Sequence, residues 1–372
     1  MDFVVFGTGN RAEKFLIQWY GKIEISFFFD NYKKEKFHGY TVYSPFYKEN
    51  IFIVVAVEDV NVYQSIREQL IKLGYKEFED FVPYTIFKKK VAVAYGNCHI
   101  DAIRKYMELS TDFDREYGFY PFPLIQNLSS YLLIPEIIKR CDFLIHQSIR
   151  RENPYGEEYA SEEMLKNIRK ECYVLSVPNL HGLPECFFPQ LQRRNAPKIL
   201  INDLLAYTEI NIKKWVGLNM CIKEMEEYIS CGGVYSYAYI RRLWKEFISK
   251  LEKREEEWDI KISDYIYTHY QKEKLFTDRW HISTFLAREI ANRVLEKLGC
   301  ETIQDIIIPC LDTYEVFIYA DVKKALNLKF SEKSIRNFSR EKSRIEFSEM
   351  TLEKYIEMCK QIYIFEKNID NT

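Results

Sequence analysis

Twice along this chain, an apolar run of strand-forming residues ends at a glycine turn and passes into a helical pattern. The first is FVVFGTG at residues 3–9, and the second is VAVAYGNC at residues 91–98. Repeated strand, turn and helix build a parallel sheet whose right-handed crossovers place helices on its faces. The chain is therefore expected to be an α/β protein that contains two such units, separated near the three lysines at 88–90.

The chain of 372 residues divides into three predicted parts. Residues 1–88 alternate strand and helix patterns and predict a small Rossmann-like domain. Residues 89–300 predict a larger α/β domain that becomes helical after about residue 205, and residues 301–372 predict a charged helical extension packed on it. The candidate strands of the larger domain are 91–95, 141–149, 171–179 and 196–203.

Composition excludes several classes of protein. A net charge of −2 supplies no global field for nucleic acid or an anionic membrane. Nine scattered cysteines without a C-x-x-C pair argue against a disulfide framework or a zinc site, and favour a reducing compartment. No apolar run approaches the roughly 18 residues that span a bilayer. We therefore expect a cytoplasmic protein without a metal site or transmembrane segment, and homo-oligomer formation stays open.

The first glycine turn has the spacing of a dinucleotide fingerprint. Gly7-x-Gly9 follows a strand and opens a helix, and Asp30 ends the next strand. Such a turn lets the backbone approach a phosphate at a helix N-terminus, and the acid can hold a ribose hydroxyl. A domain this short supplies only one mononucleotide-binding half. It resembles the small Rossmann-like N-terminal domains of bacterial surface-sugar enzymes, with a nucleotide or nucleotide-sugar site and a docking module as the alternatives.

The second glycine turn presents a thiol. Gly96 and Asn97 end a strand, and Cys98 and His99 open a helix. The positive partial field of a helix N-terminus lowers the pKa of a thiol and raises its thiolate fraction. A packed core cysteine that happens to follow a turn is the alternative. His99 is a poor base for Cys98, because neighbouring residues on a helix point about 100° apart.

A better base lies far down the chain. Asp278 and His281 form an Asp-x-x-His pair just before a helix that Ser283 or Thr284 would cap. In that spacing the carboxylate can orient the imidazole while the other ring nitrogen faces a nucleophile.

Polar clusters also follow the other candidate strands, at 146–148 and 178–179. Ligands of open parallel sheets bind outside the carboxyl ends of the strands. We therefore expect these two clusters to converge on one crevice with the Gly96 turn.

These motifs resemble two related families. A nucleophile after the first strand and a late Asp-x-x-His form the plan of the SGNH hydrolases, with cysteine here in place of serine. The chain is more closely similar to the WcbI-type polysaccharide-biosynthesis acyltransferases, whose domain begins with a strand and Gly-Asn-Cys. They also carry a later Pro-Asn followed by aromatic residues and proline, as at 178–179 and 186–190. The resemblance spans residues 90–300, and histidine at position 99 departs from the more usual glutamine.

The resemblance implies a coenzyme-A-binding acetyltransferase of bacterial capsule or surface-polysaccharide biosynthesis. Cys98 would take the acyl group from acetyl-CoA, and His281, held by Asp278, would deprotonate a sugar hydroxyl. The backbone N–H of Cys98 is a candidate donor to the oxyanion. The other candidate oxyanion or substrate contacts are Gly96, Asn97, His99, Gln147 and Asn179. The candidate ligands of coenzyme A phosphates are Arg150, Arg151, Arg193 and Arg194.

Three alternatives to this mechanism stay open. Direct transfer would use His281 as the base, with Cys98 only lining the pocket. A thioesterase or carbohydrate esterase would use the same triad with water as the acceptor. A non-catalytic nucleotide- or sugar-binding protein would only bind its ligand.

Overall fold

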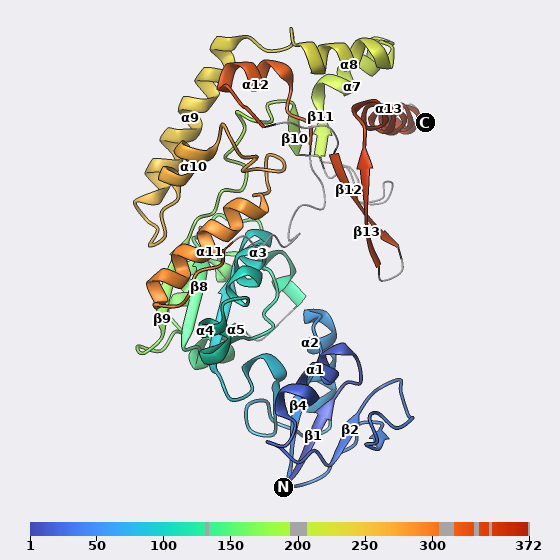
Figure 1. The fold of residues 1–372 in the computed structure, drawn as a ribbon, viewed down its shortest axis with the longest axis vertical. Helices are drawn as coiled ribbons and strands as arrows, with labels where there is room; N and C mark the ends of the chain where they lie inside the picture. Colours follow the sequence, from blue (N-terminus) through green and yellow to red (C-terminus); the bar gives the residue numbers. More distant parts are fainter. Residues whose placement is uncertain (131–133, 194–206, 305–315, 331–334, 342–343, 371–372) are drawn as a thin grey trace. The chain divides into compact units, whose positions relative to one another are not determined.

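The chain forms two units, which are described in turn. In this computed structural model the first unit comprises Met1–Leu175 with Gly299–Glu301, and the second comprises Ser176–Leu298 with Thr302–Thr372. The first unit thus joins the predicted Rossmann-like domain to the first part of the predicted 89–300 domain. Figure 1 shows the helices and strands of both units. The described residues are 1–130, 134–193, 207–304, 316–330, 335–341 and 344–370.

A parallel sheet of five strands forms the core of residues 1–88. Its strands are, in spatial order, β3 (Val42–Tyr43), β2 (Phe27–Phe29), β1 (Asp2–Phe6), β4 (Ile51–Val55) and β5 (Phe81–Pro83). Helix α1 (Asn10–Trp19) packs through Phe15 on one face, and α2 (Val60–Lys72) packs through Tyr63 on the other. Consecutive residues Val4 and Val5 of β1 belong to the two opposite cores, as a parallel strand buried on both faces requires. The Rossmann-like prediction for this part of the chain is confirmed.

A second sheet carries the second glycine turn. Its strands are, in spatial order, β7 (Tyr117–Phe119), β6 (Lys90–Tyr95), β8 (Phe143–Gln147) and β9 (Tyr173–Val177). Strand β6 runs parallel to both β7 and β8, and Tyr95 pairs with His146, so β6 and β8 end at the same level. The strands predicted at 91–95, 141–149 and 171–179 are confirmed, and the one at 196–203 lies outside the described residues.

Short helices connect the strands of this first unit. They are η1 (Tyr84–Ile86), α3 (Cys98–Met107), α4 (Thr111–Glu116), η2 (Ile125–Ser130), α5 (Ile134–Arg140), η3 (Glu157–Tyr159) and α6 (Ser161–Leu165). The predicted α/β class is therefore correct for both sheets.

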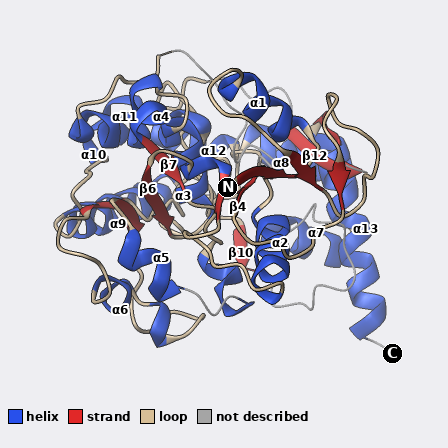
Figure 2. Ribbon diagram, turned by 90° about the horizontal axis from the view of Figure 1, so that it is seen from below, coloured by secondary structure: helices blue, strands red, loops and turns tan. Residues whose placement is uncertain are grey.

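The second unit is mainly helical, as the colours of Figure 2 show. Its helices are α7 (Ile210–Gly217), α8 (Ile222–Cys231), α9 (Tyr237–Glu255), α10 (Ser263–His269), α11 (Thr284–Leu298), α12 (Ala320–Leu326) and α13 (Leu352–Asp370). Strands β10 (Leu191–Arg193) and β11 (Tyr207–Glu209) form an antiparallel pair. In the part of the chain that the structure describes, no helix is both long and apolar enough to cross a membrane.

The predicted helical tail is wrong over residues 335–350. There β12 (Ile335–Glu341) and β13 (Arg344–Met350) form an antiparallel hairpin. Its register sets Phe338 opposite Phe347 and Arg336 opposite Glu349. The charge density of this segment resembles a solvated helix face, whereas the backbone pairs as two antiparallel strands. The helical expectation holds for α12 and α13.

A buried carboxyl group makes the second unit sensitive to pH. Glu209 is 1% exposed; it accepts hydrogen bonds from the Tyr319 hydroxyl at 2.6 Å and the Ile212 N–H at 2.5 Å. Burial nevertheless raises the pKa of Glu209 from its ordinary value of 4.5 to about 7. In this pH window the unfolded carboxyl ionises while the folded one stays protonated, so stability is fully present below pH 4.5 and lost as pH rises through about 7.

We therefore expect the free energy of unfolding to fall by about 3 kcal/mol across that window, at about 1.4 kcal/mol per unit of pKa. Denaturant titrations at several pH values measure the fall, and Glu209→Gln should remove most of it. Glu224→Gln is the matched control, because Glu224 has no burial and a lowered pKa. A pH profile unchanged in Glu209→Gln would contradict the assignment.

Candidate functional site

Cys98 is the first residue of helix α3, directly after the turn that ends β6. Asn97 caps the helix: its Oδ1 accepts the His99 N–H at 2.9 Å. The Cys98 N–H, by contrast, has no acceptor among the described residues, as is usual in the first turn of a helix. Cys98 is half-buried, whereas Cys186 and Cys359 are fully buried. The thiol and a helix N-terminal amide therefore occur together at a partly accessible position.

Gln147, the last residue of β8, holds this turn from the neighbouring strand. Its side chain is fully buried, and its Oε1 accepts the Asn97 N–H at 2.8 Å. Ser161 supports the end of the strand, because its hydroxyl donates to the Gln147 carbonyl at 2.9 Å and accepts the Ile149 N–H at 2.8 Å. The Gln147 oxygen thus holds the Gly96–Asn97 turn that precedes Cys98, a role that the sequence did not predict. Ser161 was missed, since nothing in its local sequence marks it.

Gly96 is required by the approach of Gln147. A Cβ built at position 96 would lie 2.4 Å from the Gln147 Oε1, far inside van der Waals contact. We expect Gly96→Ala to displace the Gln147 amide, break its bond to the Asn97 N–H and lower the free energy of unfolding by about 1–3 kcal/mol. Thermal and denaturant unfolding measure this loss.

Two further variants isolate the cause. Gly217→Ala is the matched control, since a Cβ there meets nothing within 4 Å. Adding Gln147→Ala to Gly96→Ala removes the obstructing amide, so the double variant should lose less stability than the sum of the single variants. Strict additivity would show that the clash is not the cause.

Asp278 and His281 form a local pair in the second unit. The His281 Nδ1 lies 2.7 Å from the Asp278 Oδ2, while Oδ1 accepts the N–H groups of Trp280 at 2.6 Å and His281 at 3.0 Å. Asp278 is fully buried, and the His281 side chain is 28% exposed. The carboxylate therefore orients the ring through Nδ1, which leaves Nε2 as the nitrogen that could act as a general base.

A tight loop presents this pair. Phe276 and Ile282 form an antiparallel bridge, and the Ser283 N–H donates to the Leu275 carbonyl at 2.9 Å. The Ser283 hydroxyl then accepts the Leu286 N–H at 3.4 Å at the start of α11. Of the two predicted caps, the structure uses Ser283. The loop is therefore closed by backbone hydrogen bonds on both sides of His281.

Two other predicted contacts, Asn179 and His99, lie in different surroundings. The Asn179 Oδ1 accepts the His181 N–H at 3.3 Å, and its carbonyl accepts from Arg254 at 3.1 Å. The His99 side chain is 1% exposed on the inner face of α3. Of the predicted polar clusters, the structure brings together Gly96–Asn97 and Gln147, while 178–179 belongs to the second unit.

The comparisons with known proteins match a region of the chain that includes Cys98. The family model for the polysaccharide biosynthesis enzyme WcbI matches residues 91–302, which is more than half of the chain. The chain belongs to the WcbI family. It is also similar to a solved structure of WcbI, described as a novel polysaccharide biosynthesis enzyme and as the native protein without a disulfide bond between coenzyme A and one of its cysteines. That structure covers 74% of this chain and 90% of its own, with 19% identity and a TM-score of 0.57. Among curated proteins none matches the chain.

The WcbI match contains all four arginines predicted to hold coenzyme A. Arg151 forms ion pairs with Glu162 at 3.0 Å and Glu163 at 2.9 Å and is half-exposed. Arg150 is exposed next to it. Arg193 ends strand β10, and Arg194 lies outside the described residues. The carboxylates on Arg151 would have to yield before a phosphate could bind, and the role of all four stays a prediction.

The N-terminal turn lies outside the WcbI match. Gly7 has a φ of +109°, and a Cβ there would lie 3.0 Å from the Ala56 carbonyl oxygen, so the turn requires glycine. Gly9 caps α1, and Asp30 accepts the Thr8 hydroxyl at 2.8 Å. Burial raises the pKa of Asp30, but hydrogen bonds from the Lys33 and Tyr32 N–H groups outweigh it and leave the pKa lowered. Asp30 therefore stabilises its own loop as an anion, and a nucleotide site here stays a prediction.

Proposed function

We propose that this WcbI-family chain transfers an acyl group, in the simplest case acetyl, from acyl-coenzyme A to a sugar hydroxyl during bacterial surface-polysaccharide biosynthesis. The observation that carries the proposal is the Cys98 turn: a half-buried thiol at the N-terminus of α3, beside an amide N–H without an acceptor. The solved relative is described as a native protein without a disulfide bond between coenzyme A and one of its cysteines. A thiol that meets coenzyme A at its sulfur is correctly placed to accept an acyl group from it.

Each group in the proposed reaction has a defined part. The Cys98 thiolate attacks the thioester carbonyl, the new carbon–sulfur bond forms, and the coenzyme A thiol leaves. A sugar hydroxyl then attacks the acyl-cysteine, its proton passes to the His281 Nε2, and the Cys98 thiolate is released. Asp278 stabilises the imidazolium that forms. The Cys98 N–H is the first candidate to stabilise the oxyanion of both tetrahedral intermediates.

The proposal requires the His281 Nε2 to come within hydrogen-bond reach of the thiol or the acceptor hydroxyl in the working enzyme. It places the reaction in the cytoplasm, where acyl-coenzyme A and nucleotide-linked sugars are available. The N-terminal turn of Gly7 and Gly9, together with Asp30, is the proposed site of a nucleotide-linked acceptor.

Intact-mass spectrometry after addition of acetyl-coenzyme A tests the proposal. We expect a single acetyl adduct that maps to Cys98 and is discharged faster when a saccharide acceptor is added. If the acetyl adduct is hydrolysed at the same rate whether or not a saccharide is present, the thioesterase or esterase is favoured. Binding of coenzyme A with no adduct and no turnover would reduce the protein to a binding module.

A further inference from the structure

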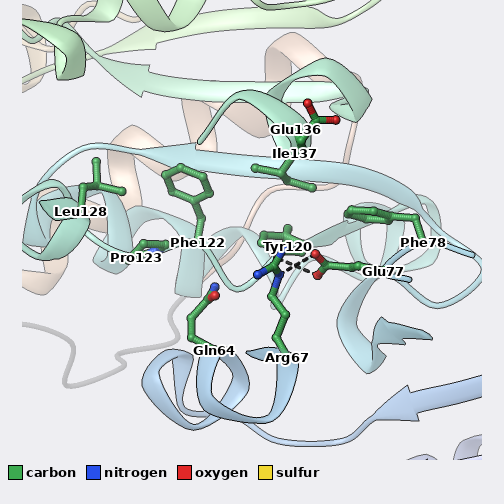
Figure 3. A pocket seen from close by; sticks show the side chains of 10 residues that line it. All are labelled: Gln64, Arg67, Glu77, Phe78, Tyr120, Phe122, Pro123, Leu128, Glu136 and Ile137. Atoms are coloured by element: carbon green, nitrogen blue, oxygen red, sulfur yellow. Dashed lines mark hydrogen bonds and ion pairs between the residues drawn. The ribbon is translucent and has the colours of Figure 1, made fainter. Parts of the chain in front are cut away.

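The Arg67–Glu77 ion pair is a buried polar pair of the first unit that is complete by itself. Figure 3 shows it at the wall of a small hollow beside α2, where the Arg67 Nε lies 2.6 Å from the Glu77 Oε2. The Tyr63 and Tyr120 hydroxyls donate to the other carboxylate oxygen of Glu77. The free volume of the hollow is about 20 Å³, which is room for roughly one water molecule. The pair therefore stabilises the core and leaves no space for a larger ligand.

Another buried pair in this unit consists of thiols. Cys141 lies just before strand β8, Cys172 lies directly before strand β9, and these strands are neighbours in the sheet. The Tyr173 N–H donates to the Asp142 carbonyl at 2.9 Å, and the ring centroids of Phe143 and Tyr173 are 6.1 Å apart. The segments that carry the two cysteines are therefore fixed against each other where the strands begin.

The two thiols contact each other. Cys141 is fully buried in the core of this unit, and Cys172 packs against that core. The Cys141 thiol hydrogen-bonds to the Cys172 sulfur, and its own sulfur lies 2.8 Å from the Phe143 carbonyl oxygen. Both cysteines are free thiols. A disulfide forms only between cysteines whose backbones are already close, and the hydrogen bond between the residues that follow them, Asp142 and Tyr173, provides this closeness.

The surroundings make the two thiols unequal. The hydrogen bond from Cys141 and the charge of Arg169 lower the pKa of the half-buried Cys172, against the effects of partial burial and of Asp142. The Arg169 guanidinium is held in place, because its Nε donates to the Cys141 carbonyl at 2.9 Å and it forms an ion pair with Asp142. Burial raises the pKa of Cys141, which therefore keeps its proton. A reachable thiol with a lowered pKa beside a second thiol is the arrangement of a redox-active pair.

We propose that Cys172 and Cys141 form a reversible dithiol–disulfide pair that reacts with hydrogen peroxide, with Cys172 as the nucleophile and Cys141 as the resolving thiol. The Cys172 thiolate attacks one peroxide oxygen, the O–O bond breaks, and a sulfenic acid and hydroxide are formed. The Cys141 sulfur then attacks the Cys172 sulfur, the S–O bond breaks, and the hydroxyl leaves as water with the Cys141 proton. The two sulfurs lose two electrons together, and one peroxide is reduced to water and hydroxide.

This pair is separate from the Cys98 turn. Cys141 precedes the first residue of β8, whereas Gln147, which holds the Gly96–Asn97 turn, is the last residue of the same strand. The proposal therefore does not depend on the proposed acyl transfer. It also agrees with the reducing compartment that the cysteine pattern favours, because disulfides in such compartments are usually transient and redox-sensing.

Peroxide treatment of the reduced full chain tests the proposal, with alkylation of the remaining thiols and mass spectrometry without reduction. We expect two fewer alkylated thiols and a cross-linked peptide that joins Cys141 to Cys172, and dithiothreitol should restore both thiols. Cys172 should react with peroxide about tenfold faster than Cys231, which is exposed but has no neighbouring thiol among the groups described for it, since a lowered pKa raises the thiolate fraction.

Variants of the full chain assign the part of each cysteine. In Cys141→Ala the sulfenic acid on Cys172 should persist and be trapped by dimedone, whereas in Cys172→Ala the Cys141 thiol should stay reduced. Cys98→Ala is the matched control, because it keeps the pair and should form the same cross-link at the same rate.

Three results would overturn the proposal. They are a sulfenic or sulfinic acid on Cys172 of the wild-type chain without a cross-link, a cross-link that joins other cysteines instead, and oxidation of Cys172 no faster than that of Cys231. All three are measured on the wild-type chain, so a loss of folding in Cys141→Ala leaves the test intact. Formation of the acetyl adduct on Cys98 is measured separately, so either proposal can fail without the other.

Discussion

Replacing Cys98 with alanine is expected to abolish the acetyl adduct and to reduce turnover of acetyl-coenzyme A by roughly 10⁴-fold or more. The reason is that removal of a covalent nucleophile removes the whole two-step route, and only weak background transfer is left. Coenzyme A release, followed with a thiol reagent under single-turnover conditions, measures the loss. The fold should persist, since Cys98 is half-buried and its side chain carries none of the hydrogen bonds that hold the turn.

Cys172→Ala is the matched control for this prediction. Cys172 is also half-buried in the first unit, but it precedes strand β9 rather than opening a helix. Cys172→Ala should therefore leave both the acetyl adduct on Cys98 and the turnover of acetyl-coenzyme A unchanged. A fall of less than about tenfold in Cys98→Ala would rule out covalent catalysis and favour direct transfer with His281 as the base.

Replacing Asp278 with asparagine is expected to lower kcat by about 10³–10⁴-fold with little change in KM. The amide can keep accepting the Trp280 and His281 N–H groups through one oxygen, as Oδ1 does now. Its NH2 group would then face the His281 Nδ1, which forces the proton onto Nε2 and removes the base. Steady-state kinetics and the rate of adduct discharge by an acceptor measure the effect.

Asp321→Asn separates this tautomer effect from loss of structure. Asp321 also holds backbone N–H groups in the second unit, those of Gly233, Val234 and Tyr235. Asp321→Asn should lower the free energy of unfolding without a comparable loss of kcat. Wild-type kcat in Asp278→Asn, with an unchanged unfolding midpoint, would remove the pair from the mechanism.

Most of the first unit could be predicted from the sequence. Buried strands such as β1 and β6 read as continuous apolar runs, and Gly7 and Gly96 mark where the chain turns into a helix. Both patterns depend on only a few neighbouring residues, so they can be recognised in the sequence without knowledge of the tertiary structure. The tail shows where such signals fail: residues 335–350 have the charge of a solvated helix but form a hairpin, because pairing across strands outweighs local propensity.

The same distinction holds for the candidate site. The Asn97 cap and the Asp278–His281 hydrogen bond each join residues no more than three positions apart, so their spacing alone sets the geometry. The function of Gln147 depended instead on the register of β6 against β8, since it contacts an N–H 50 positions away. Sequence proposed it as a substrate contact, whereas its oxygen is used to hold the turn.

The sequence by itself therefore determined the strand–turn–helix units, the thiol at the head of α3 and the aspartate that orients His281. Only the tertiary structure decided what surrounds them, such as the Gln147 amide that excludes a side chain at Gly96, and which distant residues meet, such as the Cys141 and Cys172 thiols. The physical reason is the distance along the chain over which each interaction acts. Capping and turn geometry are settled among neighbours in the chain, whereas buried polar partners are chosen by packing between segments that the sequence does not place side by side.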